Sequence, residues 1–336
     1  MDVIVFLAAA VIAFGLTALS GLFVVPYLQK LKFGQTIREI GPSWHKSKNG
    51  TPTMGGVMMI GGFLISVILC FSVAYYSSDL FKSTTRIELS MAFAGVGLAF
   101  LMGLIGFLDD YIKVVKKRNL GLTAKQKTLF QLLASAAYLV TIYLCGYNTT
   151  WLPFFGDVNI VSGAGFIFWP IALIFIYGFT NAVNLTDGID GLASTVTLVV
   201  ACGFMLMTAY MKLIPTNIFA CALGGACLGF LVWNSHPAKV FMGDTGSLFL
   251  GGAVVGLAFS TGRPILLLIM GIQYLIEAVS VILQVAYYKK TKKRLFKMSP
   301  IHHHFELSGY SEEKIVLLFS AVTAVGCFIA LIPNIF

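Results

Sequence analysis

Long apolar runs separated by short polar connections dominate the chain, and they predict membrane-spanning helices. An α-helix rises about 1.5 Å per residue, so a bilayer core about 30 Å thick needs ~20 apolar residues per span. Such runs recur along all 336 residues. The predicted fold is therefore a single all-α transmembrane domain, residues 1–336. The ten predicted spans are 3–25, 54–76, 88–108, 128–146, 166–184, 193–211, 217–234, 248–262, 265–288 and 314–334.

Composition agrees with this pattern. The chain is 58% hydrophobic and 11% charged, whereas soluble domains carry about 25% charged residues. The regular alternation of an outer-membrane barrel is absent, and no basic segment precedes the first apolar run, so we interpret that run as a span. The six cysteines lie in apolar stretches without metal-binding spacing and are interpreted as packing residues.

The basic residues predict the orientation of the spans. One alternate set of connections, with Lys314 at its edge, carries 19 of the 23 lysines and arginines. The positive-inside rule places this set in the cytoplasm and both termini outside. The longest connection of the other set, 147–165, has turn residues around a short alternating run and predicts a β-hairpin. The predicted cytoplasmic connections are 26–53, 109–127, 185–192, 235–247 and 289–313.

Acidic and imidazole side chains gather on the predicted cytoplasmic side. Carboxylates at a membrane boundary are costly unless they are solvated or paired, so their concentration at one face predicts a shared aqueous pocket. The acidic residues at the ends of three different spans are Asp109, Asp110, Asp187, Asp190 and Asp244. The histidines on this side are His45, His236, His302, His303 and His304.

The motif "GFLDDYIK", residues 106–113, places two carboxylates side by side at the end of a span. Successive residues of a helix point about 100° apart, so Asp109 and Asp110 are expected to serve different partners, such as Mg²⁺ and a lysine. Lys113 and Lys125 supply positive charge nearby.

The motif "NAVNLTDGIDGLAS", residues 181–194, spaces Asn184, Asp187 and Asp190 by three. In a helix this spacing aligns them on one face. Gly188 and Gly191 would allow close approach of backbone or ligand. The alternative is a helix–turn–helix connection in which an aspartate caps the second helix.

The motif "WNSHPAKVFMGDTGSLFLGG", residues 233–252, places Asp244 before a span that begins with hydroxyl residues and glycines. Such a helix start suits a metal-bound diphosphate, and the alternative is again helix capping. Phe241 is a candidate for stacking on a base. In the first connection, Lys48 and Thr53 are candidate phosphate or nucleoside contacts.

The last basic loop ends in three histidines, His302, His303 and His304. Adjacent imidazoles cannot easily chelate one ion, so hydrogen bonding to phosphate or sugar is favoured over zinc. The Lys/Arg cluster of this loop is explained most simply as a membrane anchor. On the ninth span, Gln284 shares a face with Glu277 and is close enough to the cytoplasmic end to reach the pocket.

Together, "TPTMGG", "GFLDDYIK", "NLTDGIDGLA", "GDTGSLFLGG" and "PIHHHFE" resemble the polyprenyl-phosphate N-acetylhexosamine 1-phosphate transferases over essentially the whole chain. The uninterrupted histidine triplet followed by Phe305 and Glu306 resembles the muramoyl-pentapeptide branch in particular. That resemblance implies Mg²⁺-dependent transfer of phospho-MurNAc-pentapeptide from UDP-MurNAc-pentapeptide to undecaprenyl phosphate, giving lipid I and UMP. It also implies a bacterial inner-membrane location and suggests a homodimer.

The resemblance also implies roles for individual residues. Asp244 matches the metal ligand, and Asp109 and Asp110 match an aspartate pair implicated in catalysis. His302 matches an active-site histidine, and we predict a catalytic role for it as well. The substrate-binding positions that it implies, with Thr53 added from the first connection, are Lys48, Thr53, Lys125, Asn184, Asp187, Gly188, Ile189, Asp190, Asn234, Phe241, Gln284, His303 and His304.

Two mechanisms and three rival functions stay open at this point. The lipid phosphate is largely dianionic at pH 7, which favours its direct attack on the donor's β-phosphorus over a covalent aspartyl intermediate. The nearest rival function is a UDP-GlcNAc:polyprenyl-phosphate GlcNAc-1-phosphate transferase. An ion-coupled transporter would keep its coupling sites near the bilayer midplane. A structural scaffold leaves the one-sided acid cluster unexplained.

Overall fold

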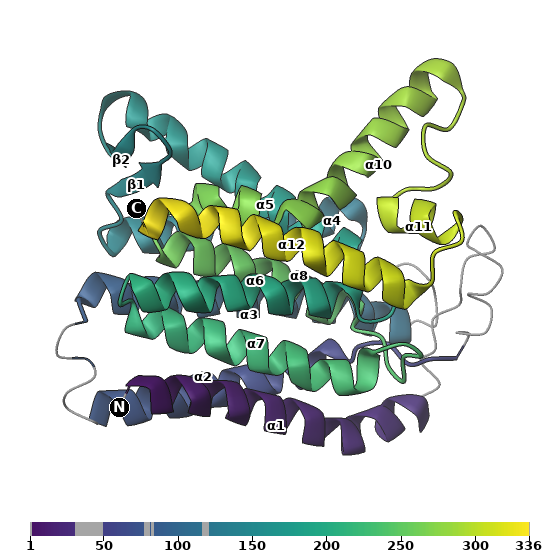
Figure 1. Ribbon diagram of the computed structural model, residues 1–336, viewed down its shortest axis with the longest axis horizontal. Coiled ribbons are helices and arrows are strands. Elements are labelled where there is room, and N and C mark those ends of the chain that lie inside the picture. The colour runs from purple at the N-terminus through teal and green to yellow at the C-terminus, as the bar shows by residue number, and fades with distance from the viewer. Residues whose placement is uncertain (1, 31–49, 77–80, 82–83, 116–120, 336) are drawn as a thin grey trace.

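The computed structural model describes residues 2–30, 50–76, 81, 84–115 and 121–335 and is mainly helical (Figure 1). In chain order, the elements are α1 (Asp2–Lys30), α2 (Gly56–Tyr76), α3 (Arg86–Val115), α4 (Ala124–Leu144), β1 (Thr149–Leu152), β2 (Gly156–Asn159), η2 (Gly163–Ile167), α5 (Phe168–Thr186), α6 (Leu192–Tyr210), α7 (Ile214–Asn234), α8 (Gly243–Ser260), η3 (Pro264–Leu266), α9 (Leu267–Met270), α10 (Ile272–Thr291), α11 (Ile301–Glu306) and α12 (Glu312–Ile335).

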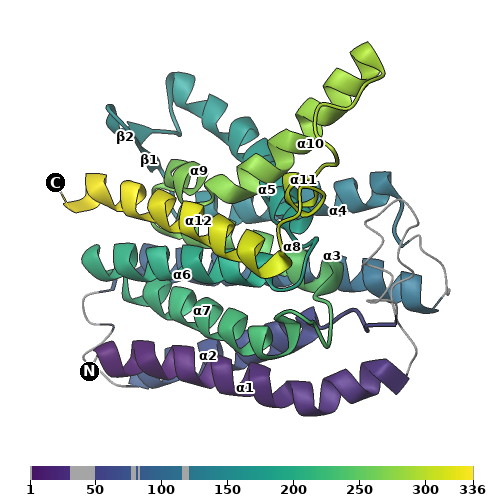
Figure 2. The same ribbon diagram turned by 45° about the vertical axis from the view of Figure 1, so that its right-hand side comes forward.

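The helical membrane architecture predicted from the apolar runs is confirmed. Within the described ranges, eight helices are long and apolar enough to cross a bilayer, namely α1 to α7 and α12. The predicted span 265–288 is not one straight helix, because the chain bends by 78° between α9 and α10. The bend falls at Gly271, where a Cβ would lie 2.7 Å from the ring of Phe179. Beyond it, α10 leans away from the bundle (Figures 1 and 2).

The predicted span 248–262 corresponds to α8, which begins earlier, at Gly243. This helix packs against α2, α3, α5, α6 and α7, and nearly every one of its residues is buried, Asp244 being the exception. A helix that is apolar on all sides belongs in the interior. The helix α8 is therefore the central element of the bundle.

Small residues bring α3 and α8 into close contact. A Cβ on Gly95 would lie 3.1 Å from Gly256, and a Cβ on Gly106 would lie 2.0 Å from the carbonyl oxygen of Asp244. Helix pairs in membranes rely on such small residues, because close backbone approach supplies the van der Waals contact that drives their association. The two helices are antiparallel, so the end of α3 lies beside the start of α8.

The predicted hairpin in residues 147–165 is confirmed, since β1 pairs antiparallel with β2. It sits at the far end of α8: the amide of Trp151 donates to the carbonyl of Gly262 at 3.0 Å, and Arg263 lies over the Trp151 ring. The start of α1 and the end of α12 lie at this same end (Figures 1 and 2). The first turn of α8 lies at the opposite end, roughly 27 Å away at 1.5 Å per residue.

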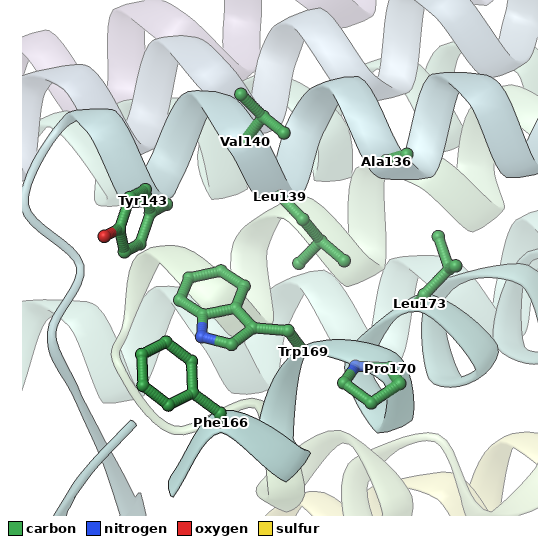
Figure 3. Close-up of a pocket in the computed structure, with 8 residues that line it drawn as sticks. All are labelled: Ala136, Leu139, Val140, Tyr143, Phe166, Trp169, Pro170 and Leu173. Atoms are coloured by element: carbon green, nitrogen blue, oxygen red, sulfur yellow. The ribbon is translucent and has the colours of Figure 1, made fainter. Parts of the chain in front are cut away.

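An apolar groove of about 400 Å³ lies between α4 and α5 (Figure 3). Leu139 and Tyr143 face it from α4, and Trp169 and Leu173 face it from α5. None of the predicted site residues within the described ranges lines it. The groove offers almost no polar group for chemistry on phosphates, so the candidate site lies elsewhere.

The expected end of the third span is wrong by several residues. The helix α3 continues to Val115, so Asp109 and Asp110 lie on its last turns and not in the following loop. Both carboxylates are buried. Their partners on neighbouring elements explain how the helix can continue through them.

Replacing Gly106 by alanine should separate α3 from α8, because the new methyl group would overlap the backbone of Asp244. Overpacking of this kind costs about 1–3 kcal/mol. We expect Gly106→Ala to lower the thermal unfolding temperature of the detergent-solubilised protein by several degrees. Gly97→Ala on the same helix meets no atom within 4 Å and should be neutral or slightly stabilising. Equal unfolding temperatures for the two variants would contradict the proposed contact.

Candidate active site

Three carboxylates from α3 and α8 converge on the ammonium group of Lys113. Its Nζ lies 2.6 Å from Asp109 Oδ2, 2.8 Å from Asp244 Oδ2 and 3.4 Å from Asp110 Oδ1. A second lysine, Lys127 at the start of α4, lies 3.1 Å from Asp244 Oδ2. Clustered negative charges repel one another unless cations lie between them. The two lysines therefore allow the acids to sit together.

Asp109 and Asp110 have different partners, as expected from their positions on a helix. The Oδ1 of Asp109 accepts the amide of Leu122 at 2.8 Å. The Oδ2 of Asp110 accepts both the amide and the hydroxyl of Thr245, at 2.9 and 2.7 Å. Asp110 thus satisfies an amide in the first turn of α8 that would otherwise lack a partner. The alternative considered for this segment, capping of the helix by its own side chains, is not what the structure has.

Asp244 is the carboxylate of the cluster that reaches solvent most, with its side chain 18% exposed against 5% for Asp109 and 3% for Asp110. Its Oδ1 accepts the amide of Asn184 at 2.8 Å. The same amide nitrogen donates to Ser247 at 2.7 Å. Asn184, on α5, therefore orients Asp244 from the opposite side to the lysines.

This donor set fits a divalent cation such as Mg²⁺. One oxygen from each of Asp109, Asp110 and Asp244 lies within 4.8 Å of the others. Carboxylate oxygens are the ligands that Mg²⁺ prefers, and it binds through one or two of them together with water and substrate phosphates. Asp244 is the best placed to hold the ion because it is the most open of the three. A bound ion would supply positive charge at the reacting phosphates.

Asn184, Asp187 and Asp190 would share a face only if the segment were helical, and the structure has the alternative, a helix–turn–helix connection. The helix α5 ends at Thr186, and Asp187 follows as its C-terminal cap with a non-helical ψ of 54°. Asp190 lies in the turn before α6, where its Oδ2 accepts the amide of Ala238 at 3.0 Å. Of the three residues only Asn184 lies on a helix, and Gly191, with a φ of 75°, turns the chain into α6.

Asp187 is close enough to the carboxylate cluster for the charges of Asp244 and Asp110 to affect its pKa. Burial, followed by the negative charges of Asp244 and Asp110, raises the pKa of Asp187 to about 8. A carboxyl group with a raised pKa favours folding at low pH, and that contribution is lost as the pH rises from about 4 to about 8. A cation bound at the cluster would offset this repulsion.

The turn that follows Asp187 contains further predicted binding residues. Gly188 is exposed and Ile189 is buried. The amide of Asp190 donates to Glu312 at 3.0 Å, and its Oδ2 lies 3.0 Å from His236 Nδ1. The first turn of α12 therefore holds the 187–191 turn in place. Glu312 and His236 were not among the predicted site residues.

Asn234 connects this turn to the segment before α8. Its Oδ1 accepts the amide of Gly191 at 3.1 Å, and its Nδ2 donates to the carbonyl of Val240 at 3.0 Å. The backbone of Phe241 pairs with residues 52–55. This pairing brings Thr53 against Gly243, next to Asp110. Thr53 Oγ1 is buried without a hydrogen-bond partner among the described residues.

The three histidines lie on α11 and have three different partners. His302 Nδ1 lies 3.0 Å from Glu277 on α10, and His303 Nδ1 lies 2.6 Å from Glu306. His304 Nδ1 accepts the amide of Lys297 at 3.2 Å. His302 is fully buried, whereas His303 and His304 are partly exposed. The adjacent imidazoles are thus not equivalent.

Gln284 holds the basic loop, since its Oε1 accepts the amides of Leu295 and Phe296. Lys125 is exposed and lies between Thr123 and Gln126, the two residues that form the capping box of α4. Lys127 contacts Asp244 in its place. Lys48 lies outside the described residues. Thr123 and Gln126 set the start of α4. Recognising this capping box in the sequence would have placed Lys127 in the first turns of that helix.

Comparisons with known proteins agree with this site. A sequence profile described as glycosyl transferase family 4 matches residues 91–262, which include the whole of α8. A phospho-N-acetylmuramoyl-pentapeptide-transferase of Listeria monocytogenes serotype 4b is 43% identical over 338 residues, covering 100% of both chains. The protein of that name from Carboxydothermus hydrogenoformans is 44% identical over 96% of each chain.

The chain belongs to the phospho-N-acetylmuramoyl-pentapeptide-transferase family. The resemblance predicted from the aspartate and histidine motifs is confirmed, and so is the prediction of a phospho-sugar transferase. The carboxylate–lysine cluster lies where α3 meets α8, and the matched segment includes all of α8 and α3 from residue 91 onward.

Lys127 should matter more to this transferase than Lys125, because Lys127 contacts Asp244 and Lys125 is exposed. We expect Lys127→Met to lower turnover at least tenfold and Lys125→Met to lower it less than threefold. The two variants lose the same charge on the same turn, so each is the control for the other. Turnover at saturating substrates decides between them. A larger loss for Lys125→Met would show that the exposed lysine serves the substrate.

Proposed function

We propose that this chain transfers phospho-MurNAc-pentapeptide from UDP-MurNAc-pentapeptide to undecaprenyl phosphate, releasing UMP and forming lipid I. The observation that supports this most strongly is the 43% identity over the full length of a relative with that transferase name. The convergence of three carboxylates and two lysines at one end of the bundle gives the activity a site.

The chemistry has to bring two phosphate groups together against their mutual repulsion. Lys113 and Lys127 supply fixed positive charge at that point, and Mg²⁺ held by Asp244 would supply more. Asp109, Asp110 and Asp244 outnumber the two lysines, so the local charge would attract the ion when substrate is absent. The acceptor phosphate is already largely ionised at pH 7, so the site needs little base strength.

Direct attack of the lipid phosphate on the donor's β-phosphorus is the favoured mechanism. An aspartyl nucleophile would need an open oxygen facing the donor. Both oxygens of Asp109 are engaged, one by the Leu122 amide and the other by Lys113. Asp109 is therefore better suited to position the acceptor and Lys113 than to form a covalent phospho-sugar intermediate.

We further propose that this end of the bundle faces the cytoplasm of a bacterium, across the inner membrane from the β1–β2 hairpin. The basic connections support this orientation through the positive-inside rule. The start of α1 and the end of α12 lie together at the hairpin end (Figure 1), as expected for an even number of crossings. Ten crossings result if α8 and the bent α9–α10 pair each cross once.

The function is tested by UMP release from purified protein in detergent. We expect release with UDP-MurNAc-pentapeptide and undecaprenyl phosphate when Mg²⁺ is present, and its loss when EDTA is added. UDP-GlcNAc in place of the peptide-bearing donor should give no product. Turnover of UDP-GlcNAc instead would favour the GlcNAc-1-phosphate transferase. Substrate transport in proteoliposomes without UMP release would favour the transporter.

Asp244→Asn should lower Mg²⁺-dependent turnover at least a hundredfold, about 3 kcal/mol in the activation barrier. The amide keeps the shape of the side chain but loses the charge that would hold the ion. Asp157→Asn, the same change in the hairpin at the other end of the bundle, is the control and should retain full turnover. Near-normal activity of Asp244→Asn would remove this residue as the metal anchor.

A further inference from the structure

Glu277 and His302 form a buried carboxylate–imidazole pair between α10 and α11. Glu277 is 0% exposed and His302 is 1% exposed. The Oε2 of Glu277 lies 3.0 Å from Nδ1 of His302. A carboxylate within a membrane helix is costly unless it is paired. The contact with His302 supplies that pairing and joins α10 to α11.

The other groups around Glu277 determine how this pair is protonated. Gln273 Nε2 donates to Oε1 of Glu277, and the backbone amide of His302 donates to Oε2. Both distances are 3.5 Å. Both groups are donors, so the Glu277 side chain acts only as an acceptor, as an ionised carboxylate does. Nδ1 of His302 therefore carries the proton that it donates to Glu277. This bond fixes the ring and leaves Nε2 on the opposite side.

Nε2 of His302 faces the turn at residues 187–191. A Cβ on Gly188 would lie 2.1 Å from Nε2, so the ring contacts the backbone of this glycine directly. Gly188 is itself exposed. Nε2 is buried and has no hydrogen-bond partner within the described part of the chain. Gly188, which has no side chain, therefore lies between the buried Nε2 of His302 and the exposed side of the turn.

We propose that Glu277 is a positioning residue for the transferase: it aims Nε2 of His302 at the 187–191 turn and so sets the position of that turn for the nucleoside diphosphate of the donor. This inference rests on the proposed role of the turn in donor binding. Nε2 is the acceptor available to a backbone amide of the turn when donor is bound. His302 acts behind the turn and does not itself touch the reacting phosphates.

The neighbouring histidine provides a matched comparison. His303 pairs with Glu306 on the same short helix α11, 2.6 Å away. That pair is three residues apart within α11, and the ring atoms that lie nearest to Gly188 belong to His302. Removing the charge of Glu306 should therefore leave the turn where it is. We expect the pair formed by Glu277 and His302 to affect donor binding, and the pair formed by His303 and Glu306 not to affect it.

Steady-state kinetics test the proposal. We expect Glu277→Gln to raise KM for UDP-MurNAc-pentapeptide at least tenfold at saturating undecaprenyl phosphate, and to change kcat less than threefold. Glu306→Gln should change KM less than twofold. In a His302→Gln background, Glu277→Gln should add less than twofold, because Glu277 acts through that ring. An unchanged KM in Glu277→Gln, additive effects, or an equal effect of Glu306→Gln would each overturn the proposal.

A second variant keeps the test decisive if Glu277→Gln does not fold. Gly188→Ala places a methyl group against Nε2 from the exposed side of the turn and should also raise the donor KM at least tenfold. Wild-type KM in this variant would overturn the proposal. Nitrogen-15 NMR of histidine-labelled protein, with His302 assigned from His302→Gln, should show a protonated Nδ1 and an unprotonated Nε2. The reverse tautomer would also overturn it.

Failure of the inference can be told apart from failure of the proposed function. Wild-type protein that releases no UMP from the donor would remove the function whatever the variants do. Wild-type protein that releases UMP while Glu277→Gln keeps the wild-type donor KM would leave the function intact and remove only the role of Glu277. Thermal unfolding of each variant shows that the kinetics come from folded protein.

Discussion

The close approach of α3 and α8 is the constraint on which the candidate active site depends. Gly106 leaves no side chain between α3 and the backbone of Asp244, so the two helices meet at that level. One turn further on, α3 presents Asp109 and Asp110 to the first turn of α8. The bond from Thr245 to Asp110 then joins the helix ends. Without this contact Asp244 would not share Lys113 with Asp109 and Asp110.

Charge balance explains why the cluster is stable and also why it suits phosphate chemistry. Three carboxylates are held by two lysines, which leaves a net negative charge that would attract a divalent cation. In the proposed reaction the same lysines would lie beside the two phosphate groups that have to meet. Asp244 has the most open side chain of the three acids and links the buried cluster to solvent. The arrangement thus stabilises the fold and prepares the site at once.

The C-terminal part of the chain supports the site from behind. Glu312 at the start of α12 and His302 on α11 both contact the 187–191 turn. The bend at Gly271 directs α10 away from the bundle, and Glu277 lies just after it on the buried side. Segments more than a hundred residues from the turn therefore fix its position. Their contribution to donor binding is indirect, through the backbone.

The sequence by itself determined the class of fold, the hairpin and the residue types of the site. The length of the apolar runs, the aspartate motifs and the histidine triplet can be recognised locally in the sequence. Apolar runs have to be buried and charged groups have to be paired however the helices pack. Only the tertiary structure decided that α3 continues through Asp109 and Asp110, that Asp187 and Asp190 part at a turn, and that Lys127 meets Asp244 while Lys125 stays exposed. The reason is physical: a local pattern fixes which groups need a partner, but the partner comes from another helix. Which helix arrives is set by close packing at glycines such as Gly106.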